Sequence, residues 1–200
     1  MRGTKRRTPS GAAVLRPDLT DSIVEAALDE LAEKGYQGLS MDAVSRRAGV
    51  GKSALYRRWP SKQDMAVSIV AQLGVPVVEV TDTGSFRGDV RALLDSVRRW
   101  FEDRRLGPIF TDLIGVARTN VALGDALTEH LGEPRRRRGS VILDRAIERK
   151  EIPADIDREL VMDLLAAPVF WRLHARREAI TPEYLDSVTD FLIRALASRA

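Results

Sequence analysis

Apolar residues recur at helical spacing over most of this chain, in steps of three and four with polar residues between them. The pattern runs through residues 21–31 and, further along, through residues 90–101, 139–147, 160–165 and 184–195. Thr181-Pro182-Glu183 is typical of a helix start, whereas Pro168 is expected to kink or break its helix. No segment has the pattern of a strand, so the sequence predicts an all-α fold.

Turn and capping residues divide the first third of the chain into short helices. Asp18 or Thr20 is expected to cap the first helix, and Gly35 to end it. Ser40 is expected to cap the second helix, whose first turn contains Asp42, a residue that suits the positive end of the helix dipole.

A three-residue break then separates this second helix from a third. Gly49-Val50-Gly51 interrupts the helical pattern, which resumes over Lys52–Trp59. Two short helices joined by a short glycine-containing turn are typical of a helix-turn-helix motif. Pro60 ends the third helix, and Ser61 with Asp64 three residues later forms a capping box for a fourth.

We divide the chain into three parts. Residues 1–17 form a basic arm with little to bury, which we expect to be disordered when free. Residues 18–73 form a three-helix helix-turn-helix domain together with the fourth helix. Gly74–Gly84 has the composition of a linker, and residues 85–200 form a second, helical domain.

The positive charge is concentrated in the first third of the chain. The sequence has 32 basic and 29 acidic residues, but residues 1–65 carry a net charge of +4 and residues 66–200 one of −1. Between Ala43 and Lys62 there are six basic residues and no acidic one. This distribution favours a polyanion-binding module at the helix-turn-helix.

The composition excludes several kinds of chemistry. The absence of cysteine excludes disulfides, thiolate nucleophiles and cysteine-based zinc sites. The two histidines, His130 and His174, are far apart, and no phosphate-binding loop or serine-nucleophile motif is present. We therefore expect no catalytic residue, no metal ligand and no cofactor. Short apolar runs and a basic N-terminus without an apolar core predict a soluble, cytoplasmic protein that has no membrane partner.

The segment Gly35–Lys62 resembles the DNA-binding domain of TetR-family transcriptional regulators, and the resemblance extends over residues 18–73. The matching motifs are Gly35-Tyr36, Ala48-Gly49-Val50, Leu55-Tyr56 and Trp59-Pro60-Ser61-Lys62. Two positions depart from the family pattern: Ser45 replaces the usual Ala, and Ala54 replaces a frequent Thr, which removes one possible hydroxyl contact to DNA.

The third helix has two distinct faces. Leu55 and Trp59 lie on one side, where they can pack against Val44 and Leu28, and the other side is polar. An Arg on the polar side can donate two hydrogen bonds to a guanine edge. By resemblance, the candidate DNA-contacting residues are Lys52, Ser53, Tyr56 and Arg57 in the major groove, Lys62 on a phosphate, and Ser40 and Arg46 near the backbone.

The resemblance also implies a homodimeric regulator, in this family most often a repressor, with a palindromic operator in double-stranded DNA. The last two helices are expected to form the dimer interface, with Leu192 on the apolar face of the final helix and Val169–Leu173 as its partner. The expected effector is a small hydrophobic or aromatic molecule that binds in the C-terminal bundle. Its candidate binding residues are Trp100, Phe101, Phe110, Leu113, Phe170 and Trp171, with few charges among them.

Several alternatives remain open. An architectural DNA-binding protein without an effector is the main one, and an α-helical enzyme is a weaker one. The run Arg135–Arg138 is expected to be a solvated helix start rather than a second polyanion site. The basic arm either follows the DNA or is inert, and His174 contacts a ligand or lies in the dimer interface.

Overall fold

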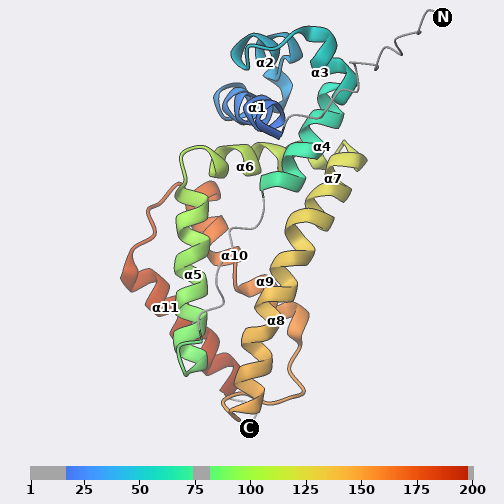
Figure 1. Cartoon of the computed structure of the whole chain (residues 1–200). Coiled ribbons are helices and arrows are strands. Elements are labelled where there is room, and N and C mark those ends of the chain that lie inside the picture. Colours follow the sequence, from blue (N-terminus) through green and yellow to red (C-terminus); the bar gives the residue numbers. More distant parts are fainter. Residues whose placement is uncertain (1–16, 74–81, 198–200) are drawn as a thin grey trace, which may run out of the picture.

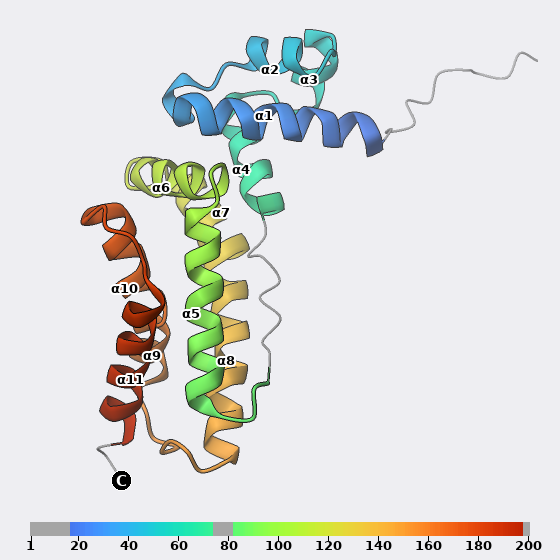
Figure 2. The same cartoon turned by 90° about the vertical axis from the view of Figure 1, so that its left-hand side faces the viewer.

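The structure is a computed structural model that describes residues 17–73 and 82–197. Within these ranges it contains only helices and turns, which confirms the all-α prediction (Figures 1 and 2). The helices are α1 (Pro17–Gly38), α2 (Met41–Arg47), α3 (Lys52–Arg58), α4 (Lys62–Leu73), α5 (Phe86–Glu102), α6 (Leu106–Ala117), α7 (Val121–Leu127), η1 (Thr128–Gly132), α8 (Glu133–Glu148), α9 (Arg158–Leu164), α10 (Ala167–Phe170), η2 (Trp171–Ala175) and α11 (Pro182–Ala197), where η marks a π-helical turn.

Two of the predicted segments fall largely outside the described residues. Only Pro17 of the arm 1–17 is described, and residues 74–81 of the linker Gly74–Gly84 are not. The division into domains therefore stays a prediction. No helix in the described ranges is long and apolar enough to cross a membrane.

Most of the predicted caps are confirmed by hydrogen bonds. Ser40 Oγ accepts from the backbone N–H of Ala43 at 3.3 Å. Asp64 and Ser61 form the reciprocal bonds of a capping box, since the Ser61 N–H donates to Asp64 Oδ2 and the Asp64 N–H to Ser61 Oγ. Thr181 Oγ1 accepts from the N–H of Tyr184 at the start of α11.

Other predicted boundaries are wrong or incomplete. Helix α1 begins at Pro17, so Asp18 and Thr20 lie inside it and neither is its cap. The break predicted at Pro168 is confirmed, because α9 ends at Leu164 and Pro168 lies in the first turn of a separate short helix, α10. The sequence analysis missed α7, which Asn120 caps by accepting from the N–H of Leu123.

Two hydrophobic cores hold these helices together. The first joins α1–α4 to α6, α7 and η1, and its members include Ile109 and Leu123 from beyond the predicted linker. The second joins α5, α8, α9, α10 and α11. Figure 2 shows α9–α11 as a layer on one side of α5 and α8. Phe110 on α6 packs against both cores, so α6 connects the two halves of the molecule.

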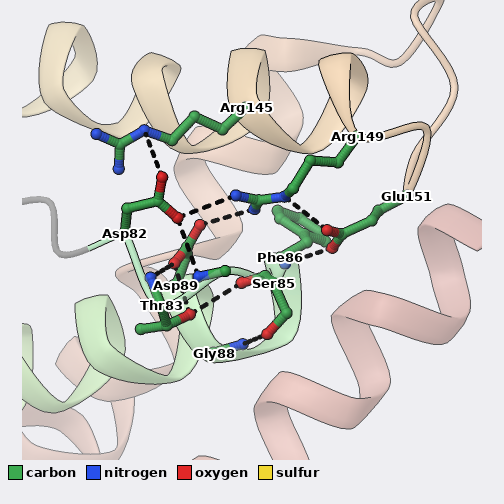
Figure 3. Close-up of polar contacts among 10 residues, drawn as sticks. Asp82, Thr83, Ser85, Phe86, Gly88, Asp89, Arg145, Arg149 and Glu151 are labelled. Atoms are coloured by element: carbon green, nitrogen blue, oxygen red, sulfur yellow. Dashed lines mark hydrogen bonds and ion pairs between the residues drawn. The ribbon is translucent and has the colours of Figure 1, made fainter.

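A cluster of polar contacts fixes α5 against α8 at the end far from α1 (Figure 3). Asp89 on α5 is 1% exposed, and its carboxylate accepts from the N–H and hydroxyl of Thr83. Arg149, just after α8, donates to Asp89 at 2.9 Å, to Asp82 at 3.1 Å and to Glu151 at 2.6 Å. Burial raises the pKa of Asp89, but the hydrogen bonds from Thr83 and Arg149 outweigh it and hold this pKa below its ordinary value.

We expect Asp89→Asn to lower the free energy of unfolding by about 2 kcal/mol at neutral pH, because a charge-assisted hydrogen bond is lost. The wild-type carboxylate stabilises the fold fully above the unfolded-state pKa of about 4, and this contribution is lost as the pH falls through the lower folded-state pKa. Denaturant unfolding between about pH 7 and pH 3 should therefore show a smaller acid-dependent decline in the variant.

The matched control is Asp144→Asn, which removes an exposed carboxylate that pairs with Arg158 at 2.7 Å. Its effect should stay below about 0.5 kcal/mol. Equal losses in the two variants would contradict a special role for Asp89.

Candidate nucleic-acid interface and adjoining cavity

The turn between α2 and α3 is held by its own backbone geometry and by one buried hydroxyl. Gly49 has a φ of 66°, in the left-handed region that favours glycine. Ser45, which is 3% exposed, donates from its hydroxyl to the carbonyl of Val50 at 2.6 Å. The N–H of Val50 returns a bond to the carbonyl of Ser45 at 3.0 Å. The pair of bonds sets the angle at which α3 leaves the turn.

One face of α3 is buried and the other is open to solvent. Leu55 is completely buried and Trp59 is 6% exposed, and both belong to the same core as Val44 and Leu28, as predicted. On the opposite face Tyr56 is 44% exposed. Ser53 and Arg57 are also exposed on this face. Helices α2 and α3 lie at the top of the molecule in Figure 1, at the opposite end from the C-terminus.

The basic side chains of this region differ in whether they already have a partner. Lys52 forms an ion pair with Asp42 at 2.6 Å, and Arg47 pairs with Glu33 at 2.7 Å. Arg46 and Arg57 are exposed and have no hydrogen bond or ion pair with any described residue. They are the candidate residues best placed to receive an external anion.

Lys62 and Ser40 also have structural roles, of which only the capping role of Ser40 was predicted from the sequence. The Lys62 ammonium donates to the carbonyls of Tyr36 and Gln37, both at 3.2 Å, and lies 4.7 Å from the centre of the Tyr36 ring. An ammonium has three N–H groups, so one remains for a phosphate. Ser40 uses its hydroxyl oxygen as the cap of α2 but keeps a hydroxyl proton to donate.

The helix-turn-helix is tied directly to α6. Gly35 has a φ of 65°, which interrupts α1 near the predicted end, and the N–H of Tyr36 donates to Asp112 on α6 at 2.6 Å. Arg105, just before α6, pairs with Glu25 on α1 at 2.8 Å. Figure 1 shows α6 crossing the molecule directly beneath α1.

Residues of α5, α6, η1 and α8–α10 line a cavity of about 710 Å³, and the lining includes four aromatic side chains. Four of the six predicted ligand-binding residues line it: Trp100, Phe101, Phe110 and Phe170. The Trp100 and Phe110 rings pack edge to face with their centres 4.8 Å apart. Leu113 does not line the cavity, because it is fully buried in the first core, and Trp171 is 63% exposed on the surface.

The wall also contains charges that the sequence analysis placed elsewhere. Arg135, Arg136 and Arg138 line the cavity, so the expectations of few charges and of a solvated arginine run do not hold there. Helical spacing in the sequence indicates the position of Arg135. It lies four residues before Gly139, which lies three before Ile142, and both of these residues are on the buried face of α8.

His174 lies beside the aromatic residues rather than among the cavity-lining residues. Its ring centre is 5.1 Å from that of Phe101 and 5.0 Å from that of Phe170, and its Nδ1 is 3.2 Å from the Thr111 hydroxyl. Burial lowers the pKa of His174, which favours the neutral imidazole at physiological pH.

The outer layer of α9–α11 exposes several large apolar side chains. Phe191 is 62% exposed, Trp171 63% and Leu160 54%. A shallow second cavity of about 210 Å³ lies beside Phe191 and Pro168. Leu192, which the sequence analysis placed at a dimer interface, is only 3% exposed and packs in the second core.

Comparison with protein-family models gives two matches that together span most of the chain. Residues 23–69 match the family described as "Bacterial regulatory proteins, tetR family". Residues 80–192 match a "Tetracyclin repressor-like, C-terminal domain".

Individual proteins support the same assignment. The chain is 33% identical to the DNA-binding transcriptional repressor TetR of Mycobacteroides abscessus over 76% of its length and 80% of that protein. The crystal structure of the TetR-family regulator SCO0332 is 27% identical, has a TM-score of 0.66, and matches over 88% of this chain and 97% of that one. FadR from Bacillus subtilis in complex with stearoyl-CoA shares the fold, with a TM-score of 0.68 at 17% identity over 90% of this chain and 99% of that one.

We expect Ser45→Ala to lower the free energy of unfolding by about 1 kcal/mol, because the Val50 carbonyl loses its hydroxyl donor in the turn. Ser140→Ala is the matched control, since that hydroxyl donates to the Arg137 carbonyl at an exposed position on α8. Chemical denaturation should show the larger loss for Ser45→Ala. A change at Ser45 no larger than at Ser140 would show that the buried hydroxyl does not hold the turn.

Proposed function

The chain belongs to the TetR family of bacterial transcriptional regulators, and on that premise we propose a homodimeric repressor that binds a palindromic operator and releases it when a small apolar effector binds. The observation that carries the proposal is the exposed face of α3. Tyr56 and Arg57 project there and have no hydrogen bond or ion pair with the described part of the chain, while Leu55 and Trp59 fix the opposite face in the core.

The exposed residues divide into those that position the protein and those that read bases. Tyr56 and Lys62 are suited to phosphates, because a phenol and an ammonium can each donate to a phosphate oxygen. Arg57 is suited to guanine, since its guanidinium can donate to O6 and N7 together. The proposed contact surface also includes Lys52, Ser53, Ser40 and Arg46. Lys52 would exchange its ion pair with Asp42 for one with a DNA phosphate.

Homodimerisation follows from the length of α3 and from the exposed layer of α9–α11. A helix of this size reads only a few base pairs, so two symmetric copies are needed to specify a palindrome. Phe191 and Trp171 provide exposed apolar surface for a second copy of the chain.

Effector release is supported by the position of α6 between the cavity and the helix-turn-helix. Phe110 and Ile114 of α6 line the cavity, and Asp112 of the same helix holds the backbone at Tyr36. A ligand that displaces α6 therefore displaces α1. By linkage, a ligand that favours the non-DNA conformation must bind less tightly to the DNA-bound protein. The likeness to FadR, crystallised with stearoyl-CoA, is in keeping with a ligand-responsive fold.

Selection of bound sequences from random duplex DNA with the full-length protein tests the proposal. We expect a palindromic consensus that is still preferred as the salt concentration rises. Binding without sequence preference, which disappears with salt, would instead favour an architectural protein.

We predict that Arg57→Ala weakens binding and also relaxes the preference at one base pair of each half-site, at a cost of about 1–3 kcal/mol. Tyr56→Phe and Lys62→Ala should weaken binding by a similar factor for all sequences, because phosphate contacts do not depend on the base. Repeating the selection with each variant distinguishes the two effects. If Arg57→Ala left the consensus unchanged, its base-reading role would be wrong.

We predict that Phe191→Glu shifts the protein from dimer to monomer, because the change puts a carboxylate where the interface is proposed to be dry. Sedimentation equilibrium measures the shift, and operator binding should fall with it. Val121→Glu is the control, since Val121 is 77% exposed on α7, away from α9–α11. A Phe191→Glu protein that remains a dimer would contradict this interface.

A further inference from the structure

The lining of the cavity contains charged side chains as well as aromatic ones. Three arginines of α8 line it, together with the carboxylates of Glu133 and Asp163. Some of these charged groups already have partners within the chain, and only a group without a partner is free to bind a ligand.

Arg136 has its partners within the chain. Its guanidinium donates to Asp163 at 2.7 Å and to Glu159, both on α9. Arg138 also has an interaction within the chain. Glu133 is exposed at the start of α8, where water screens its charge.

Arg135 differs from these neighbours. It lines the cavity but has no hydrogen bond or ion pair with any described residue. Burial and the positive charge of Arg136 lower its pKa, and Asp163 only partly opposes them. A half-buried guanidinium without a partner is costly for the fold, and a bound anion would remove that cost.

Trp100 belongs to the same wall but does not present a donor to the cavity. Its indole Nε1 is buried and has no hydrogen-bond partner among the described residues, whereas a nitrogen that opened into the cavity would be accessible to solvent. The Trp100 ring instead packs edge to face against Phe101 and Phe110. Most of the other lining residues are apolar, among them Phe101, Phe110 and Phe170.

The local helix geometry brings Arg135 to this wall. Helices α7 and α8 are continuous through the π-helical turn η1, whose residues Thr128 and Leu131 also line the cavity. π-helical turns of this kind are rare and occur often at functional sites. The stripe that faces inward then continues from Leu131 to Arg135, four residues further on.

We propose that this cavity binds an amphipathic organic anion, whose carboxylate or phosphate accepts hydrogen bonds from Arg135 and whose apolar body lies against the rings of Trp100, Phe110 and Phe170. The proposal rests on the proposed function, because it names the chemical class of the effector. It differs from the expectation of a small hydrophobic or aromatic effector bound with few charges, since the anionic group is required for tight binding.

Calorimetric titration of the full-length protein with matched probes tests this. The aliphatic set is decanoate, decyl phosphate and the neutral decanol, each below its micelle concentration, and the aromatic pair is 2-naphthoate and 2-naphthol. In at least one set, we expect the anion to bind at least about 10-fold more tightly than its neutral partner. The comparison of decanoate with decyl phosphate distinguishes a carboxylate from a phosphate ligand.

The variants assign the effect to Arg135. Arg135→Gln should lower the affinity for the anion about 10-fold or more and change that for the neutral partner by less than about two-fold. Trp100→Phe, which removes the indole N–H but keeps an aromatic side chain, should change the affinities for the anion and for its neutral partner by the same factor. Arg137→Gln is the matched control, because it removes the same charge from an exposed position of α8 that does not line the cavity.

The proposal is overturned if no anion binds, if the neutral partners bind as tightly as the anions, or if Arg137→Gln has the same effect as Arg135→Gln. Operator binding, measured on the same samples, separates this outcome from failure of the proposed function. If DNA is bound specifically but the anions are not, only the present inference fails. If the anions bind as expected but leave operator affinity unchanged, the cavity binds anions and the proposed effector release is wrong.

Discussion

The contact between α1 and α6 is the constraint on which the rest of the structure depends. At Gly35 the backbone leaves the helical conformation, and the N–H of Tyr36 is bonded instead to Asp112 on α6. A side chain at Gly35 would be strained by the positive φ, and its Cβ would lie 3.1 Å from the Asp112 carboxylate. The same helix carries Phe110, which packs in both cores and lines the cavity. The orientation of α3 relative to the cavity is therefore set at α6.

The charged side chains near the two candidate sites fall into two groups, those with a carboxylate partner within the chain and those without one. Arg47 and Lys52 are neutralised by nearby carboxylates and contribute to the shape of the helix-turn-helix. Arg57 and Arg135 have no such partner among the described residues. An unpaired guanidinium on an exposed helix suits a long polyanion, whereas one in an aromatic cavity suits a small anion with an apolar body. The net charge of the whole chain, +3, indicates neither of these sites.

The predictions for the candidate site were correct where they depended on the pattern of residues within one helix. They were wrong where they depended on how that helix packs against its neighbours. Leu55 and Trp59 face the core as expected, because the alternation of apolar and polar residues within one helix decides that. The prediction that Leu113 and Trp171 bind the ligand rests on their apolar character alone. Apolar character does not say which of two cores a residue joins, and Leu113 joined the first core while Trp171 stayed exposed.

The sequence by itself determined the all-α fold and the helix-turn-helix, because these depend on helical periodicity, caps such as Ser40 and the turn at Gly49-Val50-Gly51, all of which are short-range. The family was indicated by the resemblance of the motifs between Gly35 and Lys62. Only the tertiary structure decided that Lys62 bonds the carbonyls at the end of α1, that Leu192 is buried while Phe191 is exposed, and that Arg135 lines the cavity. Each of these depends on a partner far away in the sequence. Such pairings are fixed by the packing of one helix against another, and the residue types alone do not specify that packing.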